Sequence, residues 1–347
     1  METKNYSSQL NENKTYLLVL FLFSVLFVLV YSTSTSFLYS YPDTCDSFIF
    51  QTIGKFWVQG ALPYRDLFDN KGPFLYAMNA LGYWLTGSKV GLLFIQVPIF
   101  FILSVITFRF LQLGFPRKQS FWLSIILLLG LSFGYAGGNN ACEYGMSLLV
   151  LSPYLFYKWF QQPTETANGH LYRYSFIYGL TIGLCILTRA SNALVVLMIL
   201  AYVLVHGLTQ KRIMSFLLNL ITAMTGCLVI CLPFVFYFLA NDALNDLYDS
   251  VIVSNLAFIT GLLASLMDLK RAVDLFCAYV NVLAFVVLGI LHQHTVSKTD
   301  ARPPLVCHGY WLHPLFGLHE LLPQLRLHLL PLCHHCPAGA KTPLPRE

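Results

Sequence analysis

Acidic and basic side chains gather in one short stretch of an otherwise apolar chain. Only 11% of the 347 residues are charged, yet four aspartates, two lysines and one arginine fall between residues 43 and 71. They are Asp43, Asp46, Lys55, Arg65, Asp66, Asp69 and Lys71. A carboxylate can act as a general base on a hydroxyl group. A lysine or arginine can pair with a phosphate. The stretch therefore offers a base for an acceptor hydroxyl and cations for a phosphate.

The aspartates have a second chemical use and a simpler explanation. Carboxylate oxygens also bind divalent metals, so a metal bound by Asp43 and Asp46 is an alternative to a general base. A single aspartate after a membrane anchor is more often a solvated loop charge, because short motifs are weakly specific. Here the ordered set that follows, with Asp66 and Asp69 as further candidates, favours a function. We assign no metal ligands.

The segment Lys71-Gly72-Pro73 ends the polar stretch. Lys71 could bind a phosphate as a point charge, with Arg65 as a second candidate. The alternative is an interfacial lysine that meets lipid headgroups. Pro63 and Pro73 bracket the segment between them, which predicts a constrained turn rather than a helix interior.

Three further polar residues lie close to the expected membrane helices. Glu143 follows a Gly-Gly-Asn-Asn turn, and Arg189 stands between two apolar runs with Asn192 about one helical turn beyond it. An ionisable side chain at the edge of a span can simply extend to the interface. One that faces the helix bundle is a candidate for function, because an unpaired charge in hydrocarbon is costly. We treat all three as candidate site residues.

The composition places these residues in a membrane protein. Hydrophobic residues make up 56% of the chain, with 28 phenylalanines, and the mean hydropathy is +0.63. A soluble domain could not bury that much apolar surface. The net charge of +5 is modest and forms no basic face for nucleic acid. Several of the nine cysteines lie inside apolar runs, so we interpret them as small hydrophobic residues.

Apolar runs predict an all-α bundle of about eight membrane spans. A spanning helix needs about 20 mostly apolar residues, and the run Thr15–Pro42 is too long for a signal-peptide core. It is expected to be a retained anchor. The spans are Thr15–Pro42, Val90–Phe108, Gln119–Cys142, Tyr144–Tyr157, Tyr174–Thr188, Ala190–Gln210, Ile213–Ala240 and Leu275–Leu291.

The charges of the loops predict an orientation. If Gly72–Gly87 lies as a helix on the outer surface, the cytosolic loops hold more lysine and arginine than the outer loops, as the positive-inside rule requires. Residues 1–14 are then cytoplasmic, and residues 34–89 form a first outer, catalytic loop with surface helices. The transmembrane domain is expected to cover residues 15–291.

The end of the chain has a different composition. Residues 292–347 hold eight of the ten histidines and eight of the sixteen prolines. Leu, Pro, His, Gln and Arg share codons that begin with C, so we expect this tail to be the product of a frameshift near residue 300. The cluster Cys333-His334-His335-Cys336 lacks the usual ligand spacing of a zinc site, and we assign no metal there.

The motifs carry a resemblance to a known family. The pairs Asp46-Ser47 and Gly54-Lys55, and the run Pro63–Pro73, resemble those of bacterial membrane glycosyltransferases of the GT-C superfamily. Within this superfamily, the motifs resemble those of the protein mannosyltransferase-like and aminoarabinose transferase-like group. The resemblance covers about residues 15–290, and it continues through Leu75-Tyr76, Asn79–Gly82, Gly137-Gly138-Asn139, Glu143, Arg189 and Asn192.

The resemblance implies a multi-pass enzyme of a bacterial inner membrane that serves the cell envelope. Such an enzyme moves a sugar from a polyprenyl-phosphate donor to a glycan, lipid or protein acceptor at the extracytoplasmic face. An acidic residue of the first outer loop is catalytic in the family, which maps to Asp46. The Lys-Pro-Pro pattern that supports donor phosphate binding appears here as Lys71-Gly72-Pro73, with Gly in place of the first Pro.

Two other functions are open at this point. A transporter or flippase of polyprenyl-linked glycans would show inverted repeats and charges at the membrane midplane, and the sequence shows neither. An inactive remnant of the enzyme would follow from the aberrant tail. The sequence names neither the sugar nor the acceptor.

Overall fold

The computed structural model describes residues 2–40, 45–133, 135–162 and 169–257, and every regular element in these ranges is a helix. The expected all-α fold is therefore confirmed for the described residues. Asp43, the expected span Leu275–Leu291 and the aberrant tail lie outside them.

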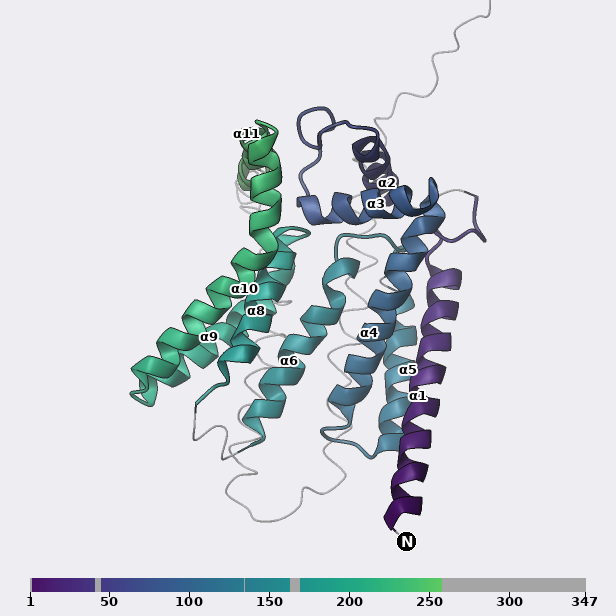
Figure 1. The fold of residues 1–347 in the computed structure, drawn as a ribbon, viewed down its shortest axis with the longest axis vertical. Helices are drawn as coiled ribbons and strands as arrows, with labels where there is room; N and C mark the ends of the chain where they lie inside the picture. Colours follow the sequence, from purple (N-terminus) through teal and green to yellow (C-terminus); the bar gives the residue numbers. More distant parts are fainter. Residues whose placement is uncertain (1, 41–44, 134, 163–168, 258–347) are drawn as a thin grey trace, which may run out of the picture. The chain divides into compact units, whose positions relative to one another are not determined.

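The long helices run between two ends of the bundle (Figure 1). They are α1 (Glu2–Tyr31), α4 (Leu93–Leu111), α5 (Arg117–Gly130), α6 (Met146–Phe160), α8 (Tyr172–Ile186), α9 (Leu194–Thr209) and α10 (Ile213–Ala240). We call the end at which α1 finishes and α4 begins the loop end, and the opposite end the turn end. Helix α4 packs against α1, α5 and α6, while α8 packs against α6, α9 and α10.

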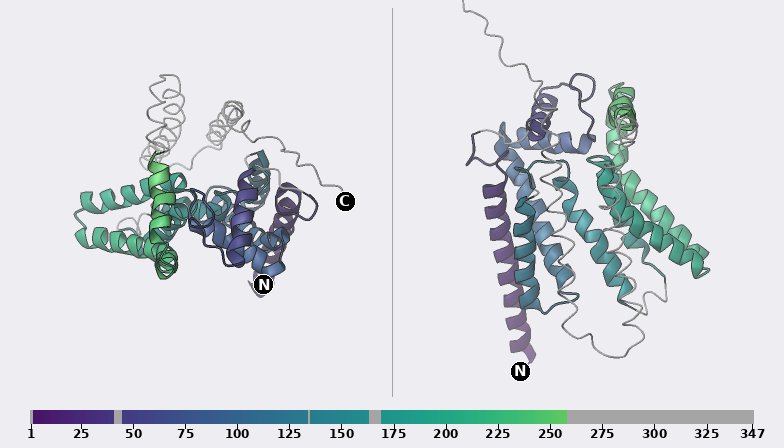
Figure 2. Two further views of the ribbon diagram at one scale, coloured as in Figure 1. Left: turned by 90° about the horizontal axis from the view of Figure 1, so that it is seen from above. Right: turned by 180° about the vertical axis from the view of Figure 1, so that it is seen from behind.

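Four of the described helical segments are long and apolar enough to cross a membrane. They are Lys14–Tyr31, Lys89–Leu111, Ala190–Thr209 and Ile213–Ala240. Helices α5, α6 and α8 have 14 or 15 residues each, which is shorter than a bilayer normally requires. They lie alongside the longer helices (Figure 2), and a total of eight spans stays a prediction.

Two expected spans end earlier than their apolar runs. The anchor Thr15–Pro42 leaves the helix after Tyr31, where the chain reads Ser-Thr-Ser-Thr-Ser. Hydroxyl side chains there can bind nearby backbone groups in place of helical partners, as Ser36 Oγ does when it accepts a hydrogen bond from Leu38 N at 3.2 Å. The span Gln119–Cys142 ends as α5 at Gly130, because the next residues enter a glycine-rich turn.

Two shorter helices lie across the loop end (Figure 1). Helix α2 spans Cys45–Val58 and helix α3 spans Pro73–Thr86, which confirms a helix over the expected range Gly72–Gly87. They cross closely at Gly54, where a Cβ atom would lie 2.5 Å from Asn79 Cβ. Proline at the first position and a left-handed Gly87 after the last turn fix the two ends of α3.

The remaining elements are short. They are the 3₁₀ turns η1 (Lys89–Leu92), η2 (Leu131–Phe133), η3 (Glu143–Gly145) and η4 (Ala190–Ala193), with α11 (Leu244–Tyr248) and a π-helical turn, η5 (Asp249–Val253). Small residues allow α8 and α10 to pack backbone to backbone. A Cβ atom at Gly179 would lie 1.9 Å from Ala223 O, and one at Gly226 would lie 2.2 Å from Phe176 O. Such contacts are typical of helix pairs in membranes.

The described carboxylates beyond α1 lie at one end of the bundle, where the basic residues Lys55, Arg65, Lys71, Lys89 and Arg189 also lie. The turn end holds basic residues at the helix termini and short connections: Arg109, Arg117, Lys118, Lys158, Arg173, Lys211 and Arg212. The described carboxylates beyond α1 lie at the loop end: Asp46, Asp66, Asp69, Glu143, Asp242, Asp246 and Asp249. The loop end is therefore where acid–base chemistry has its groups.

Candidate functional site

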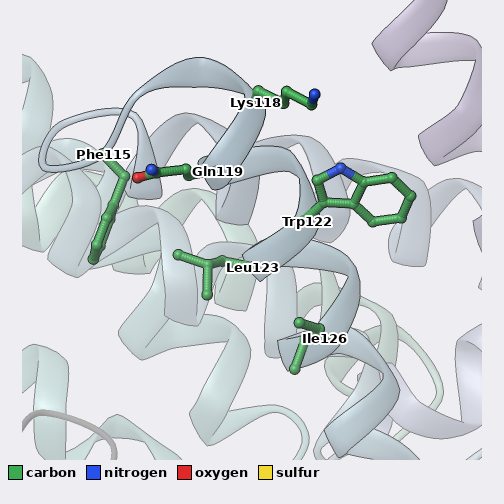
Figure 3. A pocket seen from close by; sticks show the side chains of 6 residues that line it. All are labelled: Phe115, Lys118, Gln119, Trp122, Leu123 and Ile126. Atoms are coloured by element: carbon green, nitrogen blue, oxygen red, sulfur yellow. The ribbon is translucent and has the colours of Figure 1, made fainter. Parts of the chain in front are cut away.

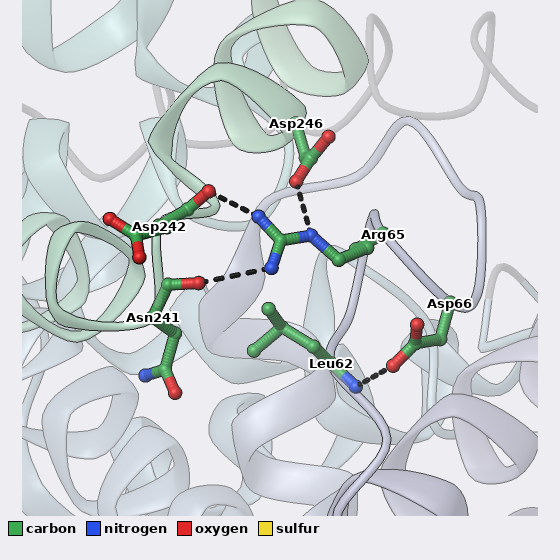
Figure 4. Close-up of polar contacts among 6 residues, drawn as sticks. All are labelled: Leu62, Arg65, Asp66, Asn241, Asp242 and Asp246. Atoms are coloured by element: carbon green, nitrogen blue, oxygen red, sulfur yellow. Dashed lines mark hydrogen bonds and ion pairs between the residues drawn. The ribbon is translucent and has the colours of Figure 1, made fainter.

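The loop between α2 and α3 is a fixed turn rather than a loose connection. Tyr64 has a left-handed backbone with φ of 72°, is 6% exposed, and donates its hydroxyl hydrogen to Lys71 O at 2.7 Å. Asp66 Oδ2 accepts a hydrogen bond from Leu62 N at 2.6 Å (Figure 4). The expected constrained turn after Pro63 is confirmed.

Arg65 ties this loop to the junction of α10 and α11 (Figure 4). Its Nε donates to Asp246 Oδ2 at 2.9 Å, and the rest of the guanidinium donates to the carbonyl oxygens of Asn241 and Asp242. The pair is partly open to solvent, with 43% of the Arg65 side chain exposed. These contacts give Arg65 a structural role, and its expected role in phosphate binding stays a prediction.

Asp69 is also held within its own loop. Its Oδ1 accepts a hydrogen bond from Asn70 N, and its Oδ2 accepts one from the Tyr76 hydroxyl, both at 2.7 Å. Because Tyr76 belongs to the buried face of α3, Asp69 joins the loop to the helix that follows. Asp66 and Asp69 thus both stabilise the turn that presents Lys71.

The backbone after Lys71 is docked on the C-terminal end of α8. Gly72 N donates to Thr188 O at 3.3 Å, and Phe74 N donates to Leu187 O at 3.1 Å. A Cβ atom at Gly72 would lie 2.1 Å from the carbonyl carbon of Leu187. Proline would lose the Gly72 hydrogen bond and clash with α8. Proline therefore does not fit at position 72, where the Lys-Pro-Pro pattern would place its first proline.

This docking brings two cations from distant parts of the sequence together. Lys71 precedes Gly72, and Arg189 follows the Thr188 residue that Gly72 contacts. The Lys71 ammonium donates to Asn70 Oδ1 at 2.7 Å, and Arg189 is exposed. Lys71 and Arg189 thus lie on adjoining backbone segments, and we call them the cation pair.

A thiol completes the surroundings of Arg189. Cys142 Sγ lies 3.9 Å from Arg189 Nη1 and 3.8 Å from Asn192 Oδ1. Arg189 and Asn192 therefore share a neighbour, although the backbone of Arg189 is extended and does not form the helical turn that the sequence spacing suggested. No role for Cys142 was predicted, because a cysteine beside an alanine in a turn carries no signal of its own.

Asp46 lies in the first turn of α2 and its side chain is exposed. The next residue, Ser47, is 1% exposed and accepts hydrogen bonds from Asn139 Nδ2 at 2.9 Å and Gln51 Nε2 at 3.1 Å. The start of α2 is therefore anchored in the bundle while Asp46 faces outward.

Beneath α2 and α3 lies a buried polar network built on an unusual turn. Ala136, Gly137, Gly138 and Asn139 all have positive φ, between 49° and 74°. A left-handed conformation costs a residue other than glycine about 1–2 kcal/mol, so Ala136 and Asn139 must be held by their surroundings. Ser34 N donates to Gly137 O at 2.9 Å. Gly138 packs on Ser32, where a Cβ atom would lie 2.1 Å from Oγ.

Glu143 is the acidic member of this network. It is 2% exposed, and its two oxygens accept hydrogen bonds from the Tyr135 hydroxyl and Asn139 N, both at 2.6 Å. Burial raises the pKa of the Glu143 carboxyl, and these donors oppose that shift. Of the two positions that the sequence left open for Glu143, at the interface or facing the bundle, the structure shows the second. The sequence did not indicate its partner Tyr135, because a tyrosine in an apolar run reads as core.

A second buried polar cluster lies at the turn end and was not predicted. The His170 ring nitrogens lie 3.1 Å from Asn219 Oδ1 and 3.2 Å from the Tyr178 hydroxyl. Trp159 packs edge-on against this ring with centroids 4.7 Å apart. Burial lowers the pKa of His170 to about 4. The cluster joins α6, α8 and α10 through neutral groups, as a structural core does.

A shallow recess of about 380 Å³ also lies at the turn end, on one side of α5 (Figure 3). Its lining is Phe115, Lys118, Gln119, Trp122, Leu123 and Ile126. The walls are apolar, and no described carboxylate lines it. The recess is therefore separate from the candidate site at the loop end.

The described carboxylates do not assemble into a metal site. Among the residues that the structure describes, no three His, Cys, Asp or Glu side chains are grouped so that they could hold a metal ion. Asp46 is exposed on α2, whereas Asp66 and Asp69 are bound within the following loop. The metal alternative stated for Asp43 and Asp46 involves a residue outside the described ranges.

Comparison with known proteins gives one family. The family model described as "Putative competence-induced protein Ccs4 N-terminal domain" matches residues 4–305. No curated protein and no solved structure matches the chain.

Proposed function

The chain belongs to the family of the putative competence-induced protein Ccs4 N-terminal domain, and we propose that it is a membrane glycosyltransferase of GT-C type. The proposed reaction moves a sugar from a polyprenyl-phosphate donor to a hydroxyl of a glycan, lipid or protein acceptor. The proposed site is the loop end. The proposal is supported by the docking of Gly72 on Thr188, which joins the backbone segments that carry Lys71 and Arg189 at the same end of the bundle as Asp46.

Each group has a proposed task in this reaction. The Asp46 carboxylate accepts the proton of the acceptor hydroxyl as its oxygen attacks the anomeric carbon. The bond from that carbon to the phosphate oxygen breaks, and its electron pair stays on the polyprenyl phosphate. The cation pair, Lys71 and Arg189, stabilises the charge of that leaving phosphate. Asn192 orients Arg189 through Cys142, their shared neighbour.

The position of the charges favours an enzyme over a transporter. A transporter places its ion and substrate sites near the middle of the membrane, in broken helices. The four candidate spans contain no aspartate or glutamate, and their lysines and arginines, Lys14, Lys89 and Arg109, lie near the helix ends. The described spans therefore carry no lysine, arginine, aspartate or glutamate near the middle of the membrane, which favours a site at the membrane surface.

The proposed orientation places the loop end outside the cytosol of a bacterial cell. It is supported by the basic residues of the turn end, as the positive-inside rule requires. A cysteine introduced at Asn70 should react with an impermeant thiol reagent in intact cells, whereas one at Lys118 should not, with the parent chain as background. Labelling at Lys118 alone, or at both positions, would contradict this orientation.

The proposal is tested by sugar transfer in proteoliposomes, with a radiolabelled polyprenyl-phosphate sugar as donor. The full chain is compared with a form continued in the neighbouring reading frame beyond the expected frameshift. Lys71→Ala and Arg189→Ala should each weaken donor binding, because each removes a cation from the phosphate. Lys118→Ala is the matched control at the turn end and should bind the donor normally. Failure of both forms to bind or use any polyprenyl-phosphate sugar would refute the proposal.

A further inference from the structure

Glu143 is buried too deeply to meet a substrate, and each of its carboxylate oxygens accepts a hydrogen bond from one turn, while Gln96 of α4 also interacts with the carboxyl group. Its Oε1 accepts from Tyr135 and its Oε2 accepts from the backbone N–H of Asn139. These two residues flank the left-handed residues between them. The carboxylate therefore bridges the beginning and the end of the strained turn, where it opposes relaxation to an ordinary backbone conformation.

The left-handed turn positions the side chain of Asn139, which joins three elements. The Asn139 amide nitrogen donates to Ser47 Oγ and to Asn79 Oδ1, each at 2.9 Å. Its amide oxygen accepts from the Tyr144 hydroxyl at 2.6 Å and from Asn79 Nδ2 at 3.1 Å. All four hydrogen-bonding positions of this amide are thus used. Asn139 clamps the first turn of α2, which carries Ser47, to α3, which carries Asn79.

We propose that Glu143 is a positioning residue that fixes Asp46 through the connected chain Glu143, Asn139 and Ser47. Asp46 directly precedes Ser47, so the hydrogen bond from Asn139 sets the backbone from which the Asp46 carboxylate projects. The role of Asp46 as the base rests on the proposed function. The geometric part, that Glu143 orders the start of α2, stands independently of it.

The hydrogen bonds of Glu143 allow a positioning role to be distinguished from a need for its negative charge. An amide can replace the carboxylate, because its oxygen accepts from Asn139 N and its nitrogen donates to the Tyr135 hydroxyl oxygen. Glu143→Gln therefore keeps both links to the turn, and Glu143→Ala removes both. Positioning predicts that Gln rescues what Ala loses. A need for the negative charge predicts that Gln and Ala fail alike.

The geometric part is tested with a spin label on the full chain in lipid nanodiscs. The label is attached through p-acetylphenylalanine at position 46, which leaves the native cysteines unchanged, and a reference label is placed at position 211. Glu143→Ala should increase label motion at position 46 and not at position 211, while Glu143→Gln should leave both spectra unchanged. His170→Ala disrupts the buried polar cluster at the other end of the bundle and serves as the matched control. An ordered label at position 46 in Glu143→Ala, or equal mobilisation by His170→Ala, would overturn the proposal.

The functional part is tested in the unlabelled protein. Glu143→Ala should lower kcat by about 10²-fold, since small misplacements of a reacting group cost about that much, while KM for the donor changes less than about twofold. Glu143→Gln should restore kcat to within about threefold of the parent chain. Loss of kcat in Gln equal to that in Ala would overturn the positioning role. If no form transfers sugar, the proposed function fails, and the spin-label result still decides whether Glu143 orders α2.

Discussion

Burial shifts the pKa of a titratable group in each of the two buried polar clusters, but the two clusters make different contacts. Burial moves the pKa of Glu143 upward and that of His170 downward, so both groups are shifted toward their neutral forms. The His170 cluster is closed by neutral partners that join neighbouring helices. The Glu143 network instead continues through Asn139 to Ser47, directly beside the exposed Asp46. A buried titratable group thus points to function only when its contacts lead to an exposed reactive one.

The first prediction separates the clusters by their response to acid. His170 has a pKa of about 4 in the folded protein against 6.5 when unfolded. Above the unfolded value neither state binds the proton, and between the two values the unfolded state binds it more tightly. Stability should therefore fall as pH drops from 6.5 toward 4, by on the order of 2–3 kcal/mol. Chemical unfolding in detergent at several pH values measures this change.

The matched variant for this prediction is His170→Gln, which keeps a hydrogen-bonding side chain but cannot gain the proton. It should remove most of the acid-induced loss between pH 6.5 and 4. Glu143 has the opposite sign, because a raised pKa gives stability that is present at low pH and lost as pH rises through the folded value. An unchanged acid response in His170→Gln would show that the turn-end cluster is not its source.

The second prediction concerns the contact that forms the cation pair. Gly72→Ala places a Cβ atom against the carbonyl of Leu187, and overpacking of this kind typically costs about 1–3 kcal/mol. We expect lower unfolding stability and weaker polyprenyl-phosphate binding, because Lys71 is displaced from Arg189. Unfolding curves and donor titrations measure the two effects.

Gly114→Ala is the control for that substitution, since a Cβ atom there meets no other atom within 4 Å. It should leave donor binding unchanged. Normal donor binding in Gly72→Ala would separate the docking of α3 on α8 from phosphate recognition, and would leave the cation pair without support.

The third prediction is the smallest and tests which loop cations serve the site. Arg65→Ala removes a half-exposed pair with Asp246, and such surface pairs contribute at most about 1 kcal/mol. We expect a small loss of stability and less loss of donor affinity than in Lys71→Ala. Equal losses of affinity in the two variants would return Arg65 to the phosphate site that the sequence suggested.

The sequence predicted the helices better than the contacts between them. Long charge-free runs identify α1, α4, α9 and α10, because apolar length is a direct signal of a span. Helix ends were less accurate, since hydroxyl side chains after Tyr31 and glycines after Gly130 end helices inside apolar runs. The helix over Gly72–Gly87 was expected because proline and glycine mark both its ends.

The candidate site was predicted in its residue types but not in its pairings. Arg189 and Asn192 were expected to share a helical face, but the backbone of Arg189 is extended, and the two side chains instead have Cys142 as a common neighbour. The docking of Gly72 on Thr188 and the hydrogen bond of Asn139 to Ser47 each join residues far apart in the chain. One sequence carries no signal for such long-range contacts. Arg65 was expected to bind phosphate because of its place in the loop, but it forms an ion pair with Asp246, which the sequence did not predict.

The turnover of Asp46→Asn shows whether catalysis takes place at the loop end. The substitution keeps size and polarity but removes the charge, and loss of a general base costs about 10²–10⁴ in rate. In an active form of the protein we expect turnover to fall by this factor, with donor binding and membrane insertion retained and with His170→Gln near normal. Near-normal turnover in Asp46→Asn would contradict the account and move the role of base to Asp43 or Asp66.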